Sequence, residues 1–261
     1  MSALDVTIVQ ADLHWHDASS NCAYFEEVIN GLENPGDLIV LPEMFSTGFT
    51  MEAQTQAERW NGPSVKWMRR IAAERSTCLC GSLIIEDNGH FYNRFILMRA
   101  DGSHSLYDKR HLFRLAGEHR HYSAGSELVA FEINGFRICP MICYDLRFPV
   151  WSRNRDRYDL LLYIANWPSP RHLAWETLIR ARAIENLTYV AAVNRVGTDG
   201  NDHLYSGGSA VIDFLGNDLV NLGDQAGTAT VSLELARLEK FRHKFAFDQD
   251  ADEFLISTLP V

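Results

Sequence analysis

The stretch "CPMICYDLRFPVW", residues 139–151, places a cysteine at the end of an apolar run and follows it at once with polar side chains. A short apolar run of this kind is typical of a buried β-strand. Tyr144, Asp145 and Arg147 come directly after the run, and a proline follows them. Two interpretations of Cys143 remain open: a small core residue before a turn, or a nucleophile held at a strand-to-helix elbow.

Strand and helix patterns alternate on both sides of this stretch. Before it, we expect strands at residues 5–10, 36–43 and 78–85, separated by helices around residues 25–32 and 64–75. After it, we expect a short helix near Val150, a strand at 159–167, a helix from about 171 to 186 and a strand at 188–194. Alternation of this kind is typical of βαβ units with parallel strands.

The middle and the end of the chain add further strands. Residues 91–98 and 103–107 read as strands, and the dipeptide Asn134-Gly135 between residues 128–133 and 136–143 indicates a hairpin. Two more strands are expected around 215–216 and at 228–233. We find no linker or break in composition, so we expect one domain over residues 1–261. So many strands exceed one open sheet, and two mixed sheets packed face to face would accommodate them.

Composition and charge exclude several classes of function. The 261 residues are 46% hydrophobic and carry a formal net charge of −10, so the chain is not built to hold nucleic acid non-specifically. The longest apolar run, residues 160–165, is far shorter than the ~20 residues that cross a bilayer. The N-terminus resembles no secretion signal, and the five cysteines are an odd number. We therefore expect free thiols and a cytoplasmic location.

Three reactive side chains each follow the end of an expected strand. Glu43 follows "DLIVLP", Lys109 follows "HSLYD" and Cys143 follows "FRICPMI". Taken singly, they also fit a solvated turn acid, a surface lysine and an inert core cysteine. Ligands of α/β folds bind at the carboxyl ends of the strands. A thiol needs a base, and an ammonium group can stabilise an oxyanion, so the three together could form an acyl-transfer site.

Three segments resemble the signature motifs of the nitrilase, or carbon–nitrogen hydrolase, superfamily. They are "LPEMFSTGF", "YDKRHLF" and "ICYDLRFPVW", in the family's order and spacing. The resemblance implies a nitrilase-type αββα sandwich with helices outside two mixed sheets, and no cofactor. It also implies that Glu43 is the general base, Lys109 the oxyanion group and Cys143 the nucleophile. Glu118 stands where many members place a second glutamate that helps hold the lysine, although an exposed loop acid would look the same.

The resemblance also points to a branch and a substrate. The segments "HLFR", "RFPVWSRN", "ANWPSPR" and "DADEF" are most similar to bacterial omega-amidases, relatives of the Nit proteins. That branch hydrolyses the terminal amide of 2-oxo dicarboxylic acid monoamides, such as 2-oxoglutaramate, and its members are commonly homodimers or larger. The alternative within the superfamily is an N-carbamoyl amino acid amidohydrolase or another small aliphatic amidase.

An anionic substrate also fits the local charge. Residues 108–121 and 145–157 each carry an excess of arginine and lysine within an acidic chain, which would attract an anion unless these groups pair with acids elsewhere. The candidate substrate-binding residues are Tyr144, Arg147, Arg171, Arg114, Asn166 and Trp167. We rank Arg171 ahead of Arg147 because Asp145 is an obvious partner for Arg147. The backbone N–H of Tyr144 is expected to contact the oxyanion.

Two other classes of function are compatible with parts of the sequence. His111, His119 and His121 with Glu118 could form a zinc site, since His-x-His is a plausible ligand pair. The hydrolase interpretation already uses Glu118 and requires no metal, so we expect none. A scaffold that kept the fold and lost its chemistry would have lost the triad, which is intact here.

Overall fold

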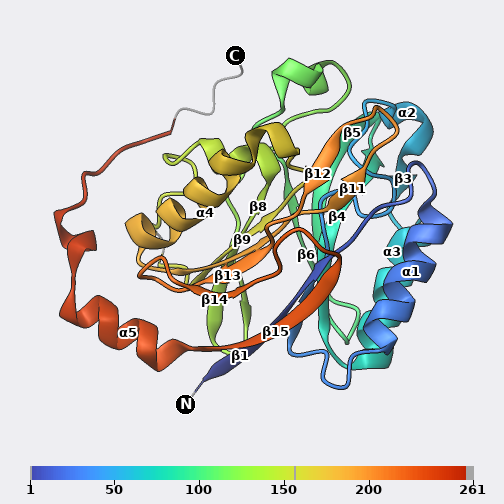
Figure 1. Ribbon diagram of the computed structural model, residues 1–261. Coiled ribbons are helices and arrows are strands. Elements are labelled where there is room, and N and C mark those ends of the chain that lie inside the picture. The colour runs from blue at the N-terminus through green and yellow to red at the C-terminus, as the bar shows by residue number, and fades with distance from the viewer. Residues whose placement is uncertain (1, 156, 257–261) are drawn as a thin grey trace.

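The structure is a computed structural model that describes residues 2–155 and 157–256, and two facing β-sheets form its centre (Figure 1). In this part of the chain the first sheet contains, in spatial order, β15 (Gly227–Glu234), β1 (Ala3–Gln10), β2 (Leu38–Val40), β4 (Cys78–Asp87), β5 (His90–Met98) and β6 (His104–Asp108), with β3 (Glu58–Arg59) beside β4. The second contains β14 (Asp218–Asn221), β13 (Ala210–Ile212), β10 (Tyr189–Val193), β9 (Leu160–Ile164), β8 (Phe136–Ile142) and β7 (Phe131–Ile133). A separate hairpin pairs β11 (Val196–Thr198) with β12 (Leu204–Ser206).

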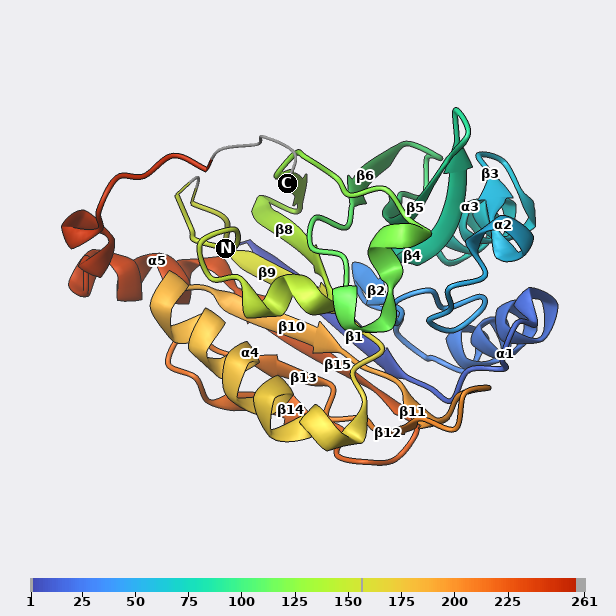
Figure 2. The ribbon, with the colours of Figure 1, turned by 90° about the horizontal axis from the view of Figure 1, so that it is seen from above.

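Helices cover the outer face of each sheet. α1 (Ala18–Asn30) and α3 (Pro63–Arg75) lie on the first sheet, and α4 (His172–Asn186) lies on the second (Figures 1 and 2). The short α2 (Ala53–Gln56) precedes β3, and α5 (Leu235–Lys244) follows β15 and extends away from the sheets (Figure 1). The αββα sandwich predicted from the sequence is therefore confirmed.

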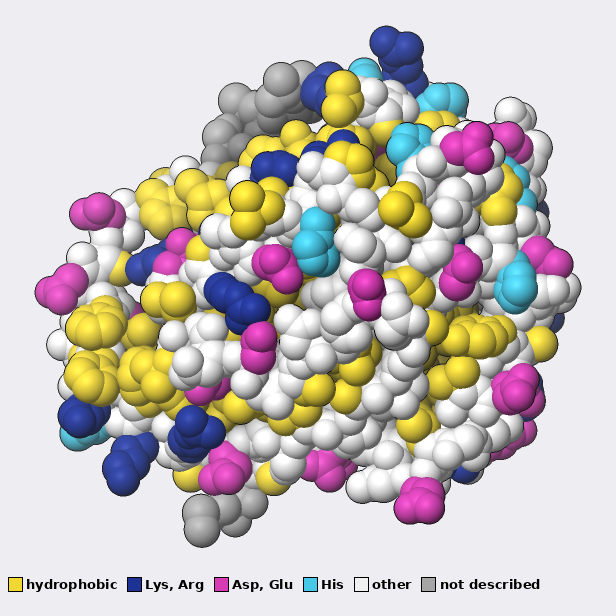
Figure 3. Space-filling view, viewed as in Figure 1, with side chains coloured by type: hydrophobic (Ala, Val, Ile, Leu, Met, Phe, Trp, Pro, Cys, Tyr) yellow, Lys and Arg dark blue, Asp and Glu magenta, His cyan; other side chains and the backbone are white. Residues whose placement is uncertain are grey.

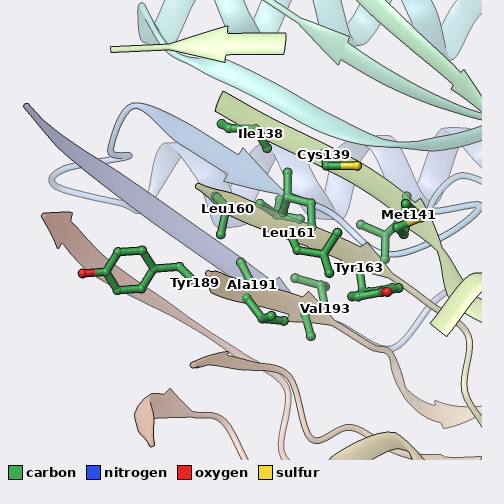
Figure 4. Close-up of a cluster of buried hydrophobic side chains, with 14 of the residues drawn as sticks. Ile138, Cys139, Met141, Leu160, Leu161, Tyr163, Tyr189, Ala191 and Val193 are labelled. Atoms are coloured by element: carbon green, nitrogen blue, oxygen red, sulfur yellow. The ribbon is translucent and has the colours of Figure 1, made fainter. Parts of the chain in front are cut away.

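The layers follow from the pattern of apolar side chains. On β2, Leu38 and Val40 join the core between the two sheets, whereas Ile39 joins the core beneath α1 and α3. Figure 4 shows side chains of the second sheet, among them Leu161 and Tyr163, in a cluster that also includes Trp175 and Ile179 of α4. Both sheets are thus buried on two faces, and strands of such sheets read as continuous rather than alternating apolar runs.

The parallel strands carry their carboxyl ends to one edge of the sandwich. β1, β2 and β4 are parallel in the first sheet, and β8, β9 and β10 are parallel in the second. β6 is antiparallel to β5, which is antiparallel to β4, so β6 points the same way as β4. The residues that follow β2, β6, β8 and β9 can therefore meet at this edge.

Two sequence expectations are corrected here. The short helix near Val150 begins earlier, as a 3₁₀ helix at Cys143–Arg147, because the strand ends in a turn at Cys143 itself. The strand expected around 215–216 is the turn between β13 and β14, where Asp213 accepts hydrogen bonds from the backbone N–H groups of Leu215 and Asn217 at 2.9 and 3.0 Å. Neither α5 nor the β11–β12 hairpin was expected. Among the described helices, none has the length and apolar character needed to cross a membrane.

Candidate active site

Cys143 lies on a sharp turn where β8 ends. Its φ of +45° is in the left-handed region, which costs a residue other than glycine roughly 1–2 kcal/mol. The backbone N–H of Ile142 donates to Asp145 Oδ2 at 3.0 Å and closes the turn. The elbow leaves the residue partly exposed and in the wall of a pocket. The sequence expectation of a cysteine at a strand-to-helix elbow thus describes the backbone correctly.

A buried lysine lies between two buried glutamates. Lys109 Nζ is 3.0 Å from Glu43 Oε1 and 3.0 Å from Glu118 Oε1. The Lys109 side chain is 1% exposed, and both glutamate side chains are 0% exposed. Desolvation makes isolated charges of this kind costly, so each ion is tolerable here because its partners are adjacent. The alternative of an exposed loop acid at Glu118 is wrong.

Glu43 is held by two asparagines. The Asn93 side-chain amide donates to Oε1 at 2.7 Å, and the backbone N–H of Asn166 donates to Oε2 at 2.8 Å. The Asn166 side chain also donates to the backbone carbonyl of Glu43 at 2.6 Å. Asn166 follows β9, and its carbonyl oxygen lies 3.9 Å from Cys143 Sγ. Asn166 therefore joins the carboxylate of the first sheet to the thiol of the second.

Glu118 is positioned by a short turn after β6. It begins a 3₁₀ helix at Glu118–Arg120, and Gly117 before it has a φ of +79°. Its second oxygen, Oε2, accepts a hydrogen bond from the backbone N–H of Phe113 at 2.5 Å. With Oε1 on Lys109, this bond fixes the orientation of the carboxylate.

Burial and charge set the protonation of these groups. Burial opposes the charged form of Lys109, but the Glu118 and Glu43 carboxylates outweigh it and raise the pKa of Lys109 above its ordinary value of 10.5. Burial raises the pKa of Glu118, with Lys109 opposing the shift. Burial, and then the charge of Glu43, raise the pKa of the Cys143 thiol well above its ordinary value. The resting thiol is therefore protonated at neutral pH, and its attack requires transfer of the proton to a base.

The pocket beside Cys143 encloses about 340 Å³. Lys109 and Cys143 lie in its wall, together with Phe113, Tyr144 and Trp167. Apolar and aromatic walls with a few charged groups are typical of small-molecule sites. Of the predicted substrate-binding residues, the structure brings Tyr144, Arg147, Asn166, Trp167 and Arg171 to this pocket.

The two arginines of the pocket are held by aromatic rings. The guanidinium carbon of Arg147 lies 5.0 Å from the centre of the Trp167 ring, and that of Arg171 lies 5.1 Å from the Phe113 ring. In residues 2–155 and 157–256, neither guanidinium has a carboxylate partner. The expected pairing of Asp145 with Arg147 is wrong, because the Asp145 carboxylate accepts hydrogen bonds from other groups.

The other arginines of the two basic segments lie elsewhere. Arg114 is exposed and is absent from the described lining of the pocket. Arg153, Arg155 and Arg157 contact the carbonyl of Glu185, the carbonyl of Phe254 and the carboxylate of Asp248, and Asp156 lies outside the described residues. On the face shown in Figure 3, acidic and basic side chains are interspersed. Of the cations in the two segments, Lys109 and Arg147 are the ones that line the pocket.

The histidines considered for zinc have other surroundings. His111 Nδ1 is 2.7 Å from Asp145 Oδ1, and Glu118 is bound to Lys109. Within the part of the chain that the structure describes, no group of three or more His, Cys, Asp or Glu residues is placed to hold a metal ion.

Sequence reasoning missed one wall of the pocket. The β11–β12 hairpin contributes Asp199, Asn201, His203 and Tyr205. Asp199 accepts hydrogen bonds from the backbone N–H groups of Asn201 and His203 at 2.8 and 3.0 Å and from the Tyr205 hydroxyl at 2.9 Å. The glycine-rich stretch 197–203 signals a turn, and only the fold places that turn beside Cys143. Asn93 was also missed, although a polar residue within the apolar run of β5 was a usable signal.

Comparison with known proteins identifies the class. The Carbon-nitrogen hydrolase family model matches residues 5–243, so the chain belongs to the carbon–nitrogen hydrolase family. The predicted class, a hydrolase that acts on amides, is thereby confirmed.

Individual relatives match nearly the whole chain. Omega-amidase YafV of Escherichia coli is 46% identical over 256 residues, which are 97% of this chain and 99% of that protein. The 2-oxoglutaramate amidase of Bacillus subtilis is 32% identical over 94% of this chain and 96% of its own length. The crystal structure of XC1258 from Xanthomonas campestris, a CN-hydrolase superfamily protein with an arsenic adduct in its active site, superposes with a TM-score of 0.96 at 44% identity and covers 98% of this chain and 100% of that one.

Proposed function

We propose that the protein is an omega-amidase that hydrolyses the terminal amide of 2-oxo dicarboxylic acid monoamides, such as 2-oxoglutaramate, to the 2-oxo acid and ammonia. The observation that carries this proposal is the placement of Arg147 and Arg171 in the same pocket as Cys143 and Lys109. Two guanidinium groups without carboxylate partners in the described chain favour an anionic substrate. The names of the relatives, omega-amidase and 2-oxoglutaramate amidase, support the same substrate class.

Acylation begins with the protonated thiol. Glu43 takes the proton as Cys143 attacks the amide carbonyl, so the buried site never holds a thiolate and two free carboxylates at once. The carbonyl oxygen becomes negative and is stabilised by the Lys109 ammonium and the backbone N–H of Tyr144. The first N–H groups of a helix have no partner inside it, which suits Tyr144 for this role.

Collapse of the tetrahedral intermediate breaks the carbon–nitrogen bond. Glu43 returns its proton to the leaving nitrogen, ammonia departs, and a thioester with Cys143 remains. Water then attacks the thioester carbonyl and gives a proton to Glu43, and the thiol is restored as the 2-oxo acid leaves. Glu118 keeps Lys109 charged and in place during both acylation and hydrolysis of the thioester.

The substrate lies between the nucleophile and the arginines. Its distal carboxylate binds the guanidinium groups of Arg147 and Arg171, which are stacked on Trp167 and Phe113 and therefore lose little freedom on binding. Asn166 keeps the Glu43 carboxylate aligned with the Cys143 thiol. This arrangement places the terminal amide, not the carboxylate end, over Cys143.

Ammonia release from a panel of substrates tests the proposal. The panel contains 2-oxoglutaramate, neutral aliphatic amides of equal length, nitriles and N-carbamoyl amino acids. We expect the highest kcat/KM for 2-oxoglutaramate and no turnover by Cys143→Ala. A higher kcat/KM for N-carbamoyl amino acids or for neutral amides would contradict the substrate assignment and leave the hydrolase class intact.

The setting of the enzyme is part of the proposal. We propose a single catalytic domain that acts in the cytoplasm as a homodimer or larger homo-oligomer on a small-molecule substrate. Light scattering coupled to size exclusion tests the oligomeric state, and a mass of one chain, 29.6 kDa, would contradict it.

A further inference from the structure

We propose that Asp145 is a positioning residue that holds the nucleophile elbow and the lysine segment in one fixed geometry. This inference rests on the proposed function, because it assigns Asp145 to the alignment of Cys143 with Lys109 and Glu43. Asp145 touches neither thiol nor substrate pocket in the described structure, so its effect acts through other residues.

The Asp145 carboxylate receives four hydrogen bonds. Oδ1 accepts from the backbone N–H of His111 at 2.9 Å and lies 2.7 Å from His111 Nδ1. Oδ2 accepts from the Tyr107 hydroxyl at 2.8 Å and from the backbone N–H of Ile142 at 3.0 Å. A carboxylate has about four acceptor sites, so this set satisfies it completely although it is 0% exposed.

The donors bracket the reactive groups on both sides. Tyr107 and His111 lie two residues before and two residues after Lys109, at the end of β6 in the first sheet. Ile142 and Asp145 enclose Cys143, at the end of β8 in the second sheet. A single carboxylate therefore fixes the segment that carries the ammonium against the turn that carries the thiol.

The same carboxylate maintains the strained conformation of Cys143. The left-handed φ of +45° persists only if the surroundings favour it, and the bond from Ile142 N–H to Asp145 spans that residue. Without this acceptor the turn can relax and move the sulfur away from Glu43 and Lys109. Displacements of about 1 Å at a reacting atom can lower a rate about 10²-fold.

Neighbouring groups fix the direction of each donor. The Trp151 indole N–H donates to the Tyr107 hydroxyl at 3.0 Å, so the hydroxyl hydrogen is directed to Asp145. The carboxylate can only accept, so it selects the form of His111 that carries a proton on Nδ1. The His111 ring also stacks on Phe148, with ring centres 3.8 Å apart and planes 7° apart.

A matched control separates positioning from simple stability. Asp213 is also buried, at 2% exposure, and also accepts backbone N–H groups of a turn, but it lies in the β13–β14 hairpin away from the pocket lining. Asp145→Asn and Asp213→Asn each remove one buried carboxylate that accepts backbone N–H groups, although Asp213 also has Arg237 3.5 Å from Oδ2. Both variants are compared for thermal unfolding, for kcat and KM on the amide that the wild type hydrolyses best, and for the rate of Cys143 alkylation.

We expect Asp145→Asn to lower kcat about 10²-fold with KM changed less than about threefold, because the pocket arginines are untouched. Asp213→Asn should lower the unfolding temperature and keep kcat. A folded Asp145→Asn enzyme with kcat within about threefold of wild type would overturn the proposal. So would equal losses of kcat in the two variants.

His111 supplies a test that leaves Asp145 in place. In His111→Asn the amide nitrogen can replace Nδ1 as a donor, whereas His111→Leu removes the donor, so kcat should be retained only in the asparagine variant. Equal kcat in both would overturn the proposal, even if Asp145→Asn does not fold. Alkylation of Cys143 needs no substrate, so it tests the positioning role independently of the proposed function. An unchanged Cys143 labelling rate in His111→Leu would also overturn the positioning role of Asp145. Failure of the proposed function would instead appear in the substrate panel of the wild type.

Discussion

Replacement of the pocket arginines should separate charged substrates from neutral ones. Arg171→Met and Arg147→Met each keep an apolar side chain against the Phe113 or Trp167 ring and remove the guanidinium. A hydrogen bond to a charged group contributes roughly 1.5–3 kcal/mol. Because 1.4 kcal/mol corresponds to a factor of ten, each change should lower kcat/KM for 2-oxoglutaramate about 10- to 150-fold. The loss should lie mainly in KM, since the carboxylate is bound equally before and during the chemical step.

The assay is ammonia release from 2-oxoglutaramate and from a neutral amide of equal length, with each variant measured on both. For the neutral amide, kcat/KM should change less than about threefold, since that substrate makes no charged contact. Arg114→Met is the comparison, because Arg114 is exposed and is not among the described residues of the pocket lining. Equal losses on the charged and neutral amides in both Arg147→Met and Arg171→Met would refute the reasoning.

Four further predictions concern the reactive groups. Cys143→Ala should abolish ammonia release while the thermal unfolding curve stays near that of the wild type, and residual turnover by the purified variant would exclude the thiol as nucleophile. Glu43→Gln should lower kcat by about 10²- to 10⁴-fold, because it removes the base that takes the thiol proton; a loss of less than about tenfold in the ammonia assay would argue against Glu43 as that base. Lys109→Arg should restore little of the activity lost in Lys109→Ala, because a planar guanidinium does not fit the position of the ammonium between two carboxylates. An active arginine variant in the same ammonia assay would mean that only positive charge is required. Since the pKa of Lys109 is raised above its ordinary value of 10.5, its ammonium form is retained as pH rises. We therefore expect no alkaline loss of kcat/KM between pH 7 and pH 10, and a loss in that range would contradict this.

The main elements of the fold were predictable because their signals are local. The helix expected at residues 64–75 is α3, Pro63–Arg75, whose side chains Val65, Met68 and Ile71 are buried. The Asn134-Gly135 dipeptide does form the turn between β7 and β8. The β11–β12 hairpin and α5 escaped prediction because the strands are three residues long and α5 has only Leu238 buried. Elements of that size carry too few apolar positions to show a period.

The candidate site was predictable at its reactive atoms and not in its supporting contacts. Glu43, Lys109 and Cys143 stand in recognisable segments after strands, and the structure brings them together. The role of Asp145 depends on Tyr107, 38 residues earlier in the chain, so nearness in sequence to Arg147 was misleading. The partners of a charged side chain depend on which backbone segments lie near it in space, and the sequence alone does not give that information.

The division of the site between two sheets has a consequence for how activity arises during folding. The carboxylate of Glu43 and the backbone N–H of Asn166 are 123 residues apart in the chain and 2.8 Å apart in space. Closing a loop of that length is entropically costly and contributes nothing until both sheets have paired. In a nascent or partly refolded chain, Cys143 is therefore not yet beside Glu43 and is inactive. Recovery of ammonia release after dilution from denaturant would report the packing of the two sheets against each other, and not the earlier formation of either sheet.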